Sequence, residues 1–457
     1  MGLASRLFKG DRVIWILFMI LCLISLIEVY SATSTLAYRS TNYWEPIVRH
    51  AFLLSIGTVC ILVCLNLPYR WFRWVGLALP LAILLLASAP YIGVVINGEP
   101  RWLSFCGISF QPSEIAKLCS ICFMAHILSK KDIIGDMKTL KIICGLVGLT
   151  IVFIFTNNGS TAILLYLIMV MMLYIGRIPV KYVLRLLLIP ALLGIIAAAI
   201  LYIVPESATN YMPGRTVTWK HRVERFFVND RVDSSGKKIS LMDAQNKHFQ
   251  EDNAKIAIAT GGVFGKFPGH GQMRDILPQA YSDFIYAIII EEMGLVGGIA
   301  VLFLYIVLLL RVRVIAKRCD KLFPKYLILG CALMLVTQAL INMAVAVGAL
   351  PVTGQPLPLI SRGGTSNVIS CFYIGIILSV SRFGANIRNE VDDYPVDKKQ
   401  EGENVPVALP GVSKEEIDNW IPDSPVAVKE TFLLSHPLYP DNSDLSLAET
   451  NHLKRLH

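Results

Sequence analysis

Long apolar runs alternate with short polar segments over most of this chain. Ten runs stand out, at residues 13–31, 47–67, 73–96, 113–130, 139–156, 159–176, 184–204, 282–311, 325–349 and 364–383. A helix of about 20 apolar residues crosses the roughly 30 Å of hydrocarbon in a bilayer. The pattern therefore predicts an all-α polytopic membrane protein with ten transmembrane helices.

The first run has a second interpretation, as a cleaved signal peptide. Lys9 and Arg12 precede it, and the small residues Ser31 and Ala32 follow it. A signal peptide has this order of charged, apolar and small residues, but its apolar part is shorter. Because the run is long and further spans follow, we predict that it is the first transmembrane helix, after a short cytoplasmic segment at residues 1–12.

The basic residues are concentrated in alternate short loops. One set of loops holds Arg70, Arg73, Lys130, Lys131, Lys138, Lys141, Arg177, Lys181, Arg185, Arg311, Arg313, Lys317, Arg318, Lys321, Lys325, Arg382 and Arg388. The opposite short loops hold little beyond Arg39, Arg101 and Arg362. Since Lys and Arg are in excess on the cytoplasmic side of membrane proteins, both termini are predicted to be cytoplasmic, and Arg101, Arg362 and residues 205–281 to face outward.

The composition supports the membrane class and argues against nucleic-acid binding. The 457 residues are 54% hydrophobic and 16% charged, against about 25% charged in soluble domains. The formal charge of +9 is distributed between the apolar runs rather than gathered in one patch, so it reports topology. Most of the ten cysteines lie within apolar runs, where they act as small hydrophobes, and no disulfide framework is expected.

Two segments differ from the alternating pattern. The outward segment at about 205–281 is the one large extracytoplasmic loop, and loops of that size are functional or disordered. Within it, residues 243–265 are predicted to form a helix, and the following glycine-rich stretch GGVFGKFPGHG is a weak candidate for phosphate binding. Residues 384–457 are rich in Asp, Glu and Pro and lack an apolar period, so we predict a disordered acidic cytoplasmic tail after a transmembrane domain at 13–383.

An acidic residue lies where the eighth apolar run begins, in the sequence DILPQAYSDFIYAIIIEEMGLVGG. Asp283 is placed at this boundary, and Glu291 and Glu292 follow inside the run, where a charge facing lipid costs several kcal/mol. Ser282 and Asp283 are both good N-cap residues, so Asp283 either starts the helix or is a working group. The local sequence leaves both possibilities open.

The second outward loop, NGEPRWLSFCGISFQPSEIAKL at 97–118, carries further candidates. Arg101 and Trp102 either belong to an interfacial aromatic belt or bind a phosphate and pack on a lipid or sugar. Glu114 and Lys117 are three residues apart and so share one helix face, where they can form an ion pair within the membrane. Such a pair is a functional hypothesis, with a purely structural pair as the alternative.

The last outward loop reads PVTGQPLPLISRGGTS, at residues 351–366. Three prolines with glycines and hydroxyls give a fixed, irregular backbone, which suits a loop that lines a cavity. Gln355 and Ser361 are its candidate substrate-binding residues. No His, Cys or acidic cluster with metal-ligand spacing and no Walker motif is found, so whether a metal takes part stays open.

Three of these segments together resemble the SEDS family (shape, elongation, division and sporulation): RWLSFCGISFQPSEIAKL, LPQAYSDFIYAIIIEEMGLVGG and PVTGQPLPLISRGGTS. The resemblance covers about residues 10–385, is closer to division than to elongation members, and implies the same ten-helix plan. It further implies a peptidoglycan glycosyltransferase that polymerises lipid II at the septum of the bacterial inner membrane. Expected partners are lipid II, a class B penicillin-binding protein, other division proteins and membrane lipids, but no nucleic acid.

The resemblance also implies roles for particular residues. Asp283 matches the family's catalytic acid/base, and the positions expected in the outer cavity are Arg101, Trp102, Gln111, Ser113, Glu114 and Lys117. The chain departs from the family where Asn158 replaces a frequent acid, Gly269-His270-Gly271 replaces Gly-Asn-Ser, and Arg362 replaces a frequent Tyr. An acid at position 158 therefore cannot be essential to this protein.

The expected chemistry needs one carboxylate. Asp283 would take the proton from the acceptor hydroxyl, and attack opposite the leaving undecaprenyl diphosphate would invert the anomeric centre. Arg101, with Lys117 or a divalent cation such as Mg²⁺ or Mn²⁺, would stabilise the leaving diphosphate. Two alternatives stay open: a lipid II flippase that uses the Glu114 and Lys117 pair, and a division scaffold without enzymatic activity.

Overall fold

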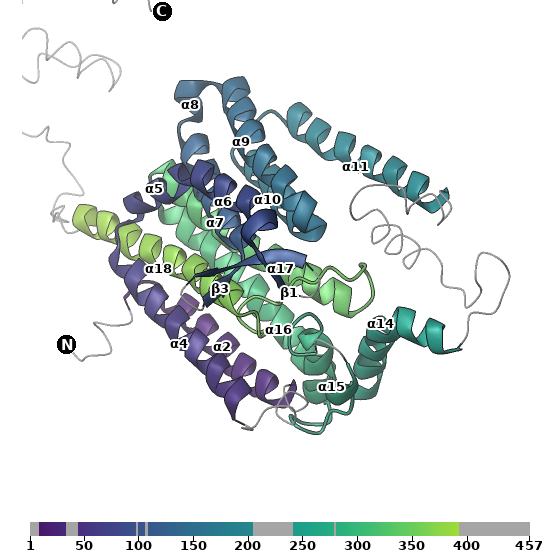
Figure 1. The fold of residues 1–457 in the computed structure, drawn as a ribbon. Helices are drawn as coiled ribbons and strands as arrows, with labels where there is room; N and C mark the ends of the chain where they lie inside the picture. The colour runs from purple at the N-terminus through teal and green to yellow at the C-terminus, as the bar shows by residue number, and fades with distance from the viewer. Residues whose placement is uncertain are drawn as a thin grey trace, which may run out of the picture. The chain divides into compact units, whose positions relative to one another are not determined.

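The structure is a computed structural model and describes residues 9–32, 44–96, 99–105, 108–203, 241–277 and 280–392. It is built mainly of helices that run alongside one another (Figure 1). The helices are α2 (Arg12–Ala32), α4 (Glu45–Asn66), η1 (Tyr69–Trp71), α5 (Phe72–Leu77), α6 (Leu79–Ile92), α7 (Pro112–Ser129), α8 (Lys131–Ile134), α9 (Asp136–Asn157), α10 (Gly159–Ile175), α11 (Val180–Ile203), α14 (Leu241–Gly261), α15 (Met273–Ile276), α16 (Ile285–Arg318), α17 (Leu322–Ala346) and α18 (Thr365–Asp392).

Each of the ten predicted spans overlaps a helix or a bent pair of helices. In the described part of the chain, seven helices are long and apolar enough to cross a membrane. An eighth span results if Tyr69–Leu77 and Leu79–Ile92, which are bent by 48°, count as one. Gly159–Ile175 is apolar but shorter. The multi-pass helical class is thus confirmed, whereas the count of ten and the sidedness stay predictions.

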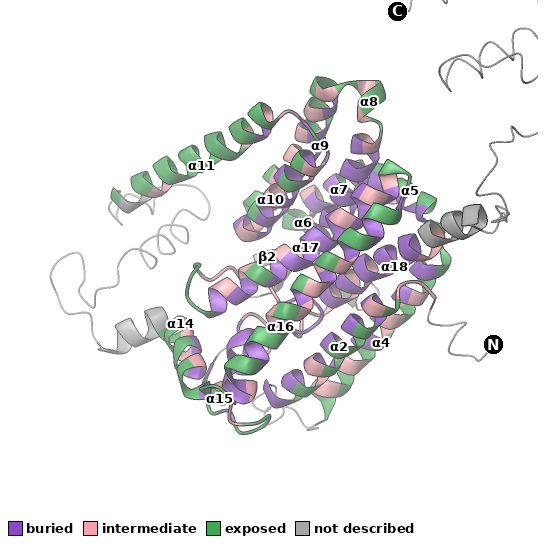
Figure 2. Cartoon of the chain, turned by 180° about the vertical axis from the view of Figure 1, so that it is seen from behind, coloured by how far each residue is buried: buried purple, intermediate pink, exposed green. Residues whose placement is uncertain are grey.

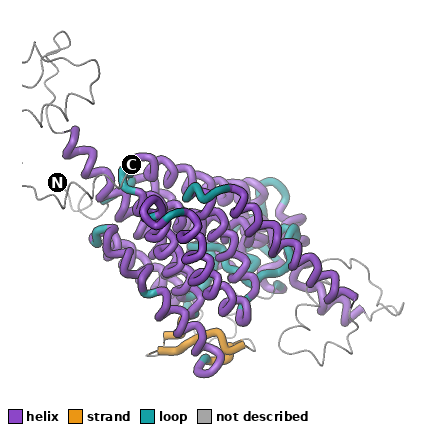
Figure 3. Tube along the Cα trace, turned by 90° about the horizontal axis from the view of Figure 1, so that it is seen from above, coloured by secondary structure: helices purple, strands orange, loops and turns teal. Residues whose placement is uncertain are grey.

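A small antiparallel sheet is the main departure from the all-α prediction. The predicted span 73–96 ends as a helix at Ile92, and the chain then forms β1 (Val94–Ile96), β2 (Glu99–Phe105) and β3 (Ile108–Phe110). Val94 pairs with Trp102, and Leu103 pairs with Phe110. β-Branched and aromatic residues favour strands, and Gly93 has already left helical backbone angles at φ −73° and ψ 146°. Viewed from above, the strands lie at one edge of the helices (Figure 3).

Two predicted boundaries shift. α18 continues to Asp392, so the first residues of the predicted disordered tail, 384–392, are helical. The rest of that tail lies outside the described residues. Within the large loop, α14 confirms the predicted helix but ends at Gly261 rather than at residue 265. The charged first part of the loop, to residue 240, lies outside the described residues.

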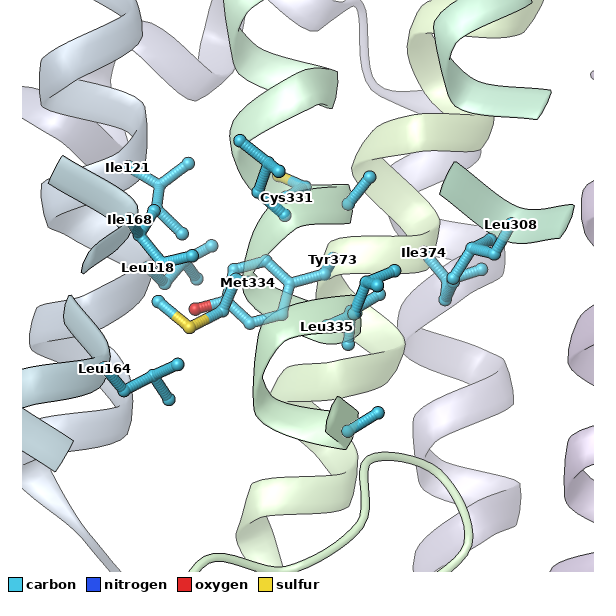
Figure 4. Close-up of a cluster of buried hydrophobic side chains, with 14 of the residues drawn as sticks. Leu118, Ile121, Leu164, Ile168, Leu308, Cys331, Met334, Leu335, Tyr373 and Ile374 are labelled. Atoms are coloured by element: carbon cyan, nitrogen blue, oxygen red, sulfur yellow. The ribbon is translucent and has the colours of Figure 1, made fainter. Parts of the chain in front are cut away.

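The core is centred on the last two helices of the bundle. Buried residues make up 72% of the spanning window of α17 and 67% of that of α18, against 6% for α11 (Figure 2). Apolar side chains of α7, α10, α16, α17 and α18 pack together in this core (Figure 4). The residues concerned are Leu118, Ile121, Leu164, Ile168, Leu308, Cys331, Met334, Leu335, Tyr373 and Ile374. The centre of the bundle is therefore packed largely with apolar side chains.

One end of the bundle is fastened by an ion pair. Both carboxylate oxygens of Asp11 accept hydrogen bonds from the Arg311 Nε, at 3.0 and 2.9 Å. The Asp11 backbone N–H donates to the Ser381 hydroxyl at 2.9 Å, so this residue joins the start of α2 to α16 and α18. All three residues belong to the side that the charge pattern predicts to be cytoplasmic.

Candidate functional site

The first part of α16 ends in a break at Gly294, and backbone groups on both sides of the break bond to another segment of the chain. Gly294 has φ 72° and ψ −177°, which interrupts the helix. The carbonyls of Glu291 and Glu292 accept instead from the N–H groups of residues 266 and 267, at 3.0 and 2.8 Å. Beyond the break, the N–H groups of residues 295 and 296 donate to the carbonyls of residues 262 and 263, at 3.0 and 3.2 Å. We call residues 262–267 with 291–296 the backbone splice.

The close approach of the two segments in the splice explains why the loop needs glycine. A Cβ on Gly265 would lie 2.2 Å from the Glu292 carbonyl oxygen, and one on Gly261 would lie 2.1 Å from that of Ile290. The two segments can therefore approach only through glycine. Since the loop's N–H groups at residues 266 and 267 are bonded to α16, they are not available to a phosphate. The glycine-rich stretch supports the broken helix.

Glu291 and Glu292 are both fully buried in protein rather than exposed to lipid. Glu291 accepts from the Lys266 ammonium at 3.0 Å and from the backbone N–H of residue 272 at 2.9 Å. Glu292 accepts from the Ser31 hydroxyl and lies 3.9 Å from the Arg274 guanidinium. Partners of this kind offset the cost of burying a charge, so the two acids fasten α2 and the large loop to α16.

Asp283 lies in a turn just before α16. The helix begins at Ile285, its N-cap is Phe284, and no side chain caps it by a hydrogen bond. The N-cap interpretation of Ser282 and Asp283 is therefore wrong, because the chain turns tightly at residues 280–284 and enters the helix later. The side chain of Asp283 is half-buried and accepts from the Ser282 hydroxyl at 2.9 Å. Burial raises the pKa of Asp283 from its ordinary value, and the bond from Ser282 opposes this.

The loop at residues 351–366, predicted to face outward, is hydrogen-bonded to the backbone around Asp283. The Asn342 side-chain amide donates at 2.8 Å to the carbonyls of both Asp283 and Gln355. The Ser361 hydroxyl donates to the Ser282 carbonyl at 2.6 Å. A Cβ on Gly354, whose φ is +67°, would lie 3.6 Å from the Asp283 Oδ2, so the loop passes directly beside the carboxylate. The structure thus brings the predicted loop and the predicted base together.

Gln355 and Ser361 use their side chains within the protein. Gln355 is buried and donates to the Thr161 hydroxyl at 2.8 Å. Ser361 is fully buried and also accepts from the backbone N–H of Leu357 at 2.7 Å. Both residues hold the loop in place beside Asp283. Their predicted contact with substrate stays a prediction.

Glu114 and Lys117 form the predicted ion pair, at 2.8 Å, and Lys117 is fully buried. The Lys117 ammonium also lies 3.4 Å from the Gln338 side-chain oxygen, and the Gln338 amide donates to the Pro356 carbonyl at 3.0 Å. The pair is therefore connected through one glutamine to the loop that borders Asp283. If Lys117 binds substrate, it does so as a lysine that is already paired with Glu114.

The remaining predicted residues surround the start of α7. Gln111 is half-buried at the N-cap of α7, and Ser113 is buried, its hydroxyl without a hydrogen-bond partner among the described residues. Trp102 is half-buried in β2; Arg101 precedes it in the strand, but its side chain lies outside the described residues. Asn158 caps α10 by accepting from the N–H of residue 161 at 3.3 Å. The departure from an acid at position 158 is thus compatible with a capping role.

Sequence reasoning missed Thr161, Gln338 and Asn342. Each donates to or accepts from the loop that borders Asp283 or the ion pair. The available signal was an amide or hydroxyl inside an apolar run, since polar groups within a span face the protein interior. Asn342 matters most, because it alone bonds the carbonyl of Asp283 itself.

Comparisons with known proteins agree on one family. The cell cycle protein family of FtsW, RodA and SpoVE matches residues 11–386. A protein of Halomonas elongata named probable peptidoglycan glycosyltransferase FtsW is 32% identical over 375 residues, covering 79% of this chain and 87% of the relative. A relative from Trichlorobacter lovleyi with the same name is 29% identical over 390 residues, covering 82% and 94%.

Solved structures show the same fold. A peptidoglycan synthase complex that coordinates polymerization and crosslinking contains a chain with TM-score 0.61 and 22% identity, covering 82% of this chain and 99% of that one. The rod shape determining protein RodA of Thermus thermophilus gives TM-score 0.56 and 22% identity, covering 83% and 98%.

Proposed function

Since the chain belongs to the cell cycle protein family of FtsW, RodA and SpoVE, we propose that it is a peptidoglycan glycosyltransferase of the FtsW type. Two relatives with that name match this chain over 94% and 87% of their own length. The reaction we propose is polymerisation of lipid II into glycan strands during cell division, at the outer side of the inner membrane.

The observation that carries the proposal is the setting of Asp283. Its carboxylate is half-buried, belongs to no ion pair within 4 Å among the described residues, and is held beside an irregular loop. A general base must be able to accept a proton, and burial raises the pKa of Asp283, which favours proton uptake. Asp283 would remove the proton from the acceptor hydroxyl as the oxygen attacks the anomeric carbon. Attack from the side opposite the undecaprenyl diphosphate inverts that centre, and the diphosphate leaves with the bonding electrons.

The leaving diphosphate needs positive charge. Arg101 and Lys117 are the candidates proposed for this role, together with the surrounding Trp102, Gln111 and Ser113. Within the described segments, no group of three or more His, Cys, Asp or Glu side chains is placed to hold a metal ion. A Mg²⁺ or Mn²⁺ ion would therefore need phosphate oxygens of the substrate as further ligands, as Mg²⁺ often does.

A class B penicillin-binding protein is the partner we propose. The support is the structural likeness to a chain of a synthase complex that couples polymerization to crosslinking. We also propose that the protein acts at the septum, and the support is its likeness to proteins named FtsW.

The test uses purified full-length protein in detergent with lipid II, with and without a class B penicillin-binding protein. Glycan strands should appear, and electrophoresis of labelled product detects them. Detergent solution offers no second membrane face, so a flippase or a scaffold would give no polymer under these conditions. Absence of polymer in both mixtures, from protein that remains folded, would contradict the proposed activity.

A further inference from the structure

Arg362 is a half-buried cation beside the candidate site. Its backbone N–H donates to the Tyr281 carbonyl at 2.9 Å, two residues before Asp283. Its guanidinium lies over the Tyr281 ring, 5.5 Å from the centroid. No carboxylate of the described residues lies within 4 Å of the Arg362 guanidinium, so this side chain forms no ion pair with them. The guanidinium thus packs on the aromatic ring, and none of its hydrogen-bond donors is taken up by an ion pair with a described carboxylate.

A second arginine adds to the positive charge at this position. Arg49 is exposed in the first turns of α4. Burial lowers the pKa of Arg362, and the charge of Arg49 lowers it further, whereas Tyr281 and Glu45 raise it. The loop at residues 351–366 is also held against α4 through α2. The Ser25 hydroxyl of α2 donates to the Ile360 carbonyl at 2.7 Å and is hydrogen-bonded to the His50 ring of α4 at 2.8 Å. Arg49, which precedes His50 in α4, and Arg362, two residues after Ile360, are therefore both held at the junction of α4 and this loop.

Two other described cations near the candidate site each form an ion pair with a carboxylate. Lys266 is paired with Glu291 at 3.0 Å, and Lys117 with Glu114 at 2.8 Å. Arg362 differs from these two lysines in that no carboxylate of the described residues forms an ion pair with it within 4 Å.

Arg362 and Lys117 also lie on different flanks of Asp283. Arg362 contacts Tyr281 and is within electrostatic range of the α4 residues Arg49 and Glu45, whereas Lys117 belongs to α7 and connects to the loop through Gln338. Figures 1 and 2 show α4 at one edge of the bundle and α7 and α10 toward the other, with α16 and α18 between them. A base at the centre would have a cation on either side.

We propose that Arg362, assisted by Arg49, binds the diphosphate of the lipid-linked acceptor, on the flank of Asp283 that faces α4. This inference rests on the proposed function, because joining two lipid-linked sugars requires two lipid-borne diphosphates at one base. A planar guanidinium donates two parallel hydrogen bonds to phosphate oxygens, and stacking on an aromatic ring fixes its orientation. With the leaving diphosphate assigned to the α7 side, Arg362 supplies the second anion site.

The test compares Arg362→Gln, Arg362→Lys and Arg49→Gln with wild type in full-length protein. Arg313→Gln is the matched control, since Arg313 is an exposed cation at the predicted cytoplasmic end of α16. All substitutions at 362 keep the backbone bond to residue 281. The measurements are the KM for lipid II, the concentration of farnesyl diphosphate that halves the rate, and the thermal stabilisation that farnesyl diphosphate gives without lipid II.

Removing a charge-assisted contact corresponds to a loss of about 10- to 100-fold in affinity. Arg362→Gln should therefore raise the KM and the inhibitory concentration of farnesyl diphosphate by such a factor, and weaken the thermal stabilisation. Arg362→Lys should fall between Gln and wild type, because lysine keeps the charge but not the fork. Arg49→Gln should give a smaller change in the same direction, and Arg313→Gln none.

Three outcomes would overturn the proposal. If Arg362→Gln lowers kcat alone and the response to farnesyl diphosphate is unchanged, Arg362 only positions residues 281–283. If the variant loses a dependence on phosphatidylglycerol in vesicles while farnesyl diphosphate acts as on wild type, it binds bulk lipid headgroups. If all constants equal those of wild type, the site does not exist. Should wild type make no polymer, the proposed activity fails, and the thermal measurement still decides whether Arg362 binds a diphosphate.

Discussion

Replacing Gly294 by alanine tests whether the backbone splice holds the part of α16 that precedes the break, residues 285–293. The backbone at φ 72° and ψ −177° belongs to a region that is essentially restricted to glycine. Forcing another residue there costs about 1–3 kcal/mol. In addition, a Cβ at 294 would lie 2.2 Å from the Val263 carbonyl oxygen and 2.5 Å from the Gly265 nitrogen. One strand of the splice must therefore move away.

The splice contains four backbone hydrogen bonds between 2.8 and 3.2 Å. Each contributes a net of about 1 kcal/mol, so losing two of them together with the backbone strain gives a total of roughly 3–5 kcal/mol. We expect Gly294→Ala to lower the free energy of unfolding by this amount, measured in detergent by thermal or denaturant unfolding. Activity should fall as well, because the helical piece that follows Asp283 depends on the splice.

Gly148→Ala is the control, since a Cβ at this α9 position meets no atom within 4 Å. Alanine in a helix is favoured over glycine by about 0.5–1 kcal/mol, so this variant should be as stable as wild type or slightly more stable. Equal stability of Gly294→Ala and wild type, within about 1 kcal/mol, would refute the reasoning, because neither the strain nor the clash would then exist.

Three further predictions follow from the site. Neutralising either Glu114 or Lys117 alone should destabilise the fold by about 3–5 kcal/mol, and the double substitution should restore part of that loss; a double variant no more stable than the worse single one in thermal unfolding would mean that the two act separately. Asn342→Leu leaves the carbonyls of Asp283 and Gln355 without their donor and should cost about 2–4 kcal/mol, so an unchanged unfolding midpoint would contradict the network. Burial raises the pKa of Asp283 above the ordinary aspartate pKa of about 3.9, and only the ionised carboxylate is a base. As the pH is lowered, the rate of polymerisation should therefore begin to fall at a pH above about 3.9. A fall that begins only at or below this pH would contradict the assignment.

The hydrophobic pattern was sufficient to predict the helices, because each span obeys a local rule of length and apolarity. Local spacing likewise predicted the ion pair of Glu114 and Lys117, which needs only one helix face. The sheet at 94–110 was missed because its first strand continues an apolar run without interruption. The N-cap interpretation failed because the turn at 280–284 delays the helix to Ile285, and nothing in the sequence marks that delay.

The site depends on pairings between distant segments, which the sequence does not encode locally. The splice joins residues 262–267 to 291–296, and neither segment alone shows that the other will satisfy its backbone. The same holds for Asn342, which reaches the carbonyl of Asp283 across 59 positions. The sequence marked Asp283 and the loop at 351–366 as unusual, and the fold shows that they are neighbours.

The central claim is that Asp283 acts as the general base, and Asp283→Asn tests it most directly. Asparagine keeps the shape and can still accept the bond from Ser282. Because the pKa of Asp283 is raised in the fold, ionisation opposes folding above that pKa; the neutral Asn should therefore be at least as stable as Asp at neutral pH, and the difference should vanish at low pH.

Stability and lipid II polymerisation are measured on the same preparations of wild type, Asp283→Asn and the control Asp320→Asn, which changes an exposed acid. The account predicts that Asp283→Asn stays folded, matches or exceeds wild type in unfolding temperature, and polymerises lipid II about 10²- to 10⁴-fold more slowly. Polymerisation by folded Asp283→Asn within a few-fold of wild type would contradict it.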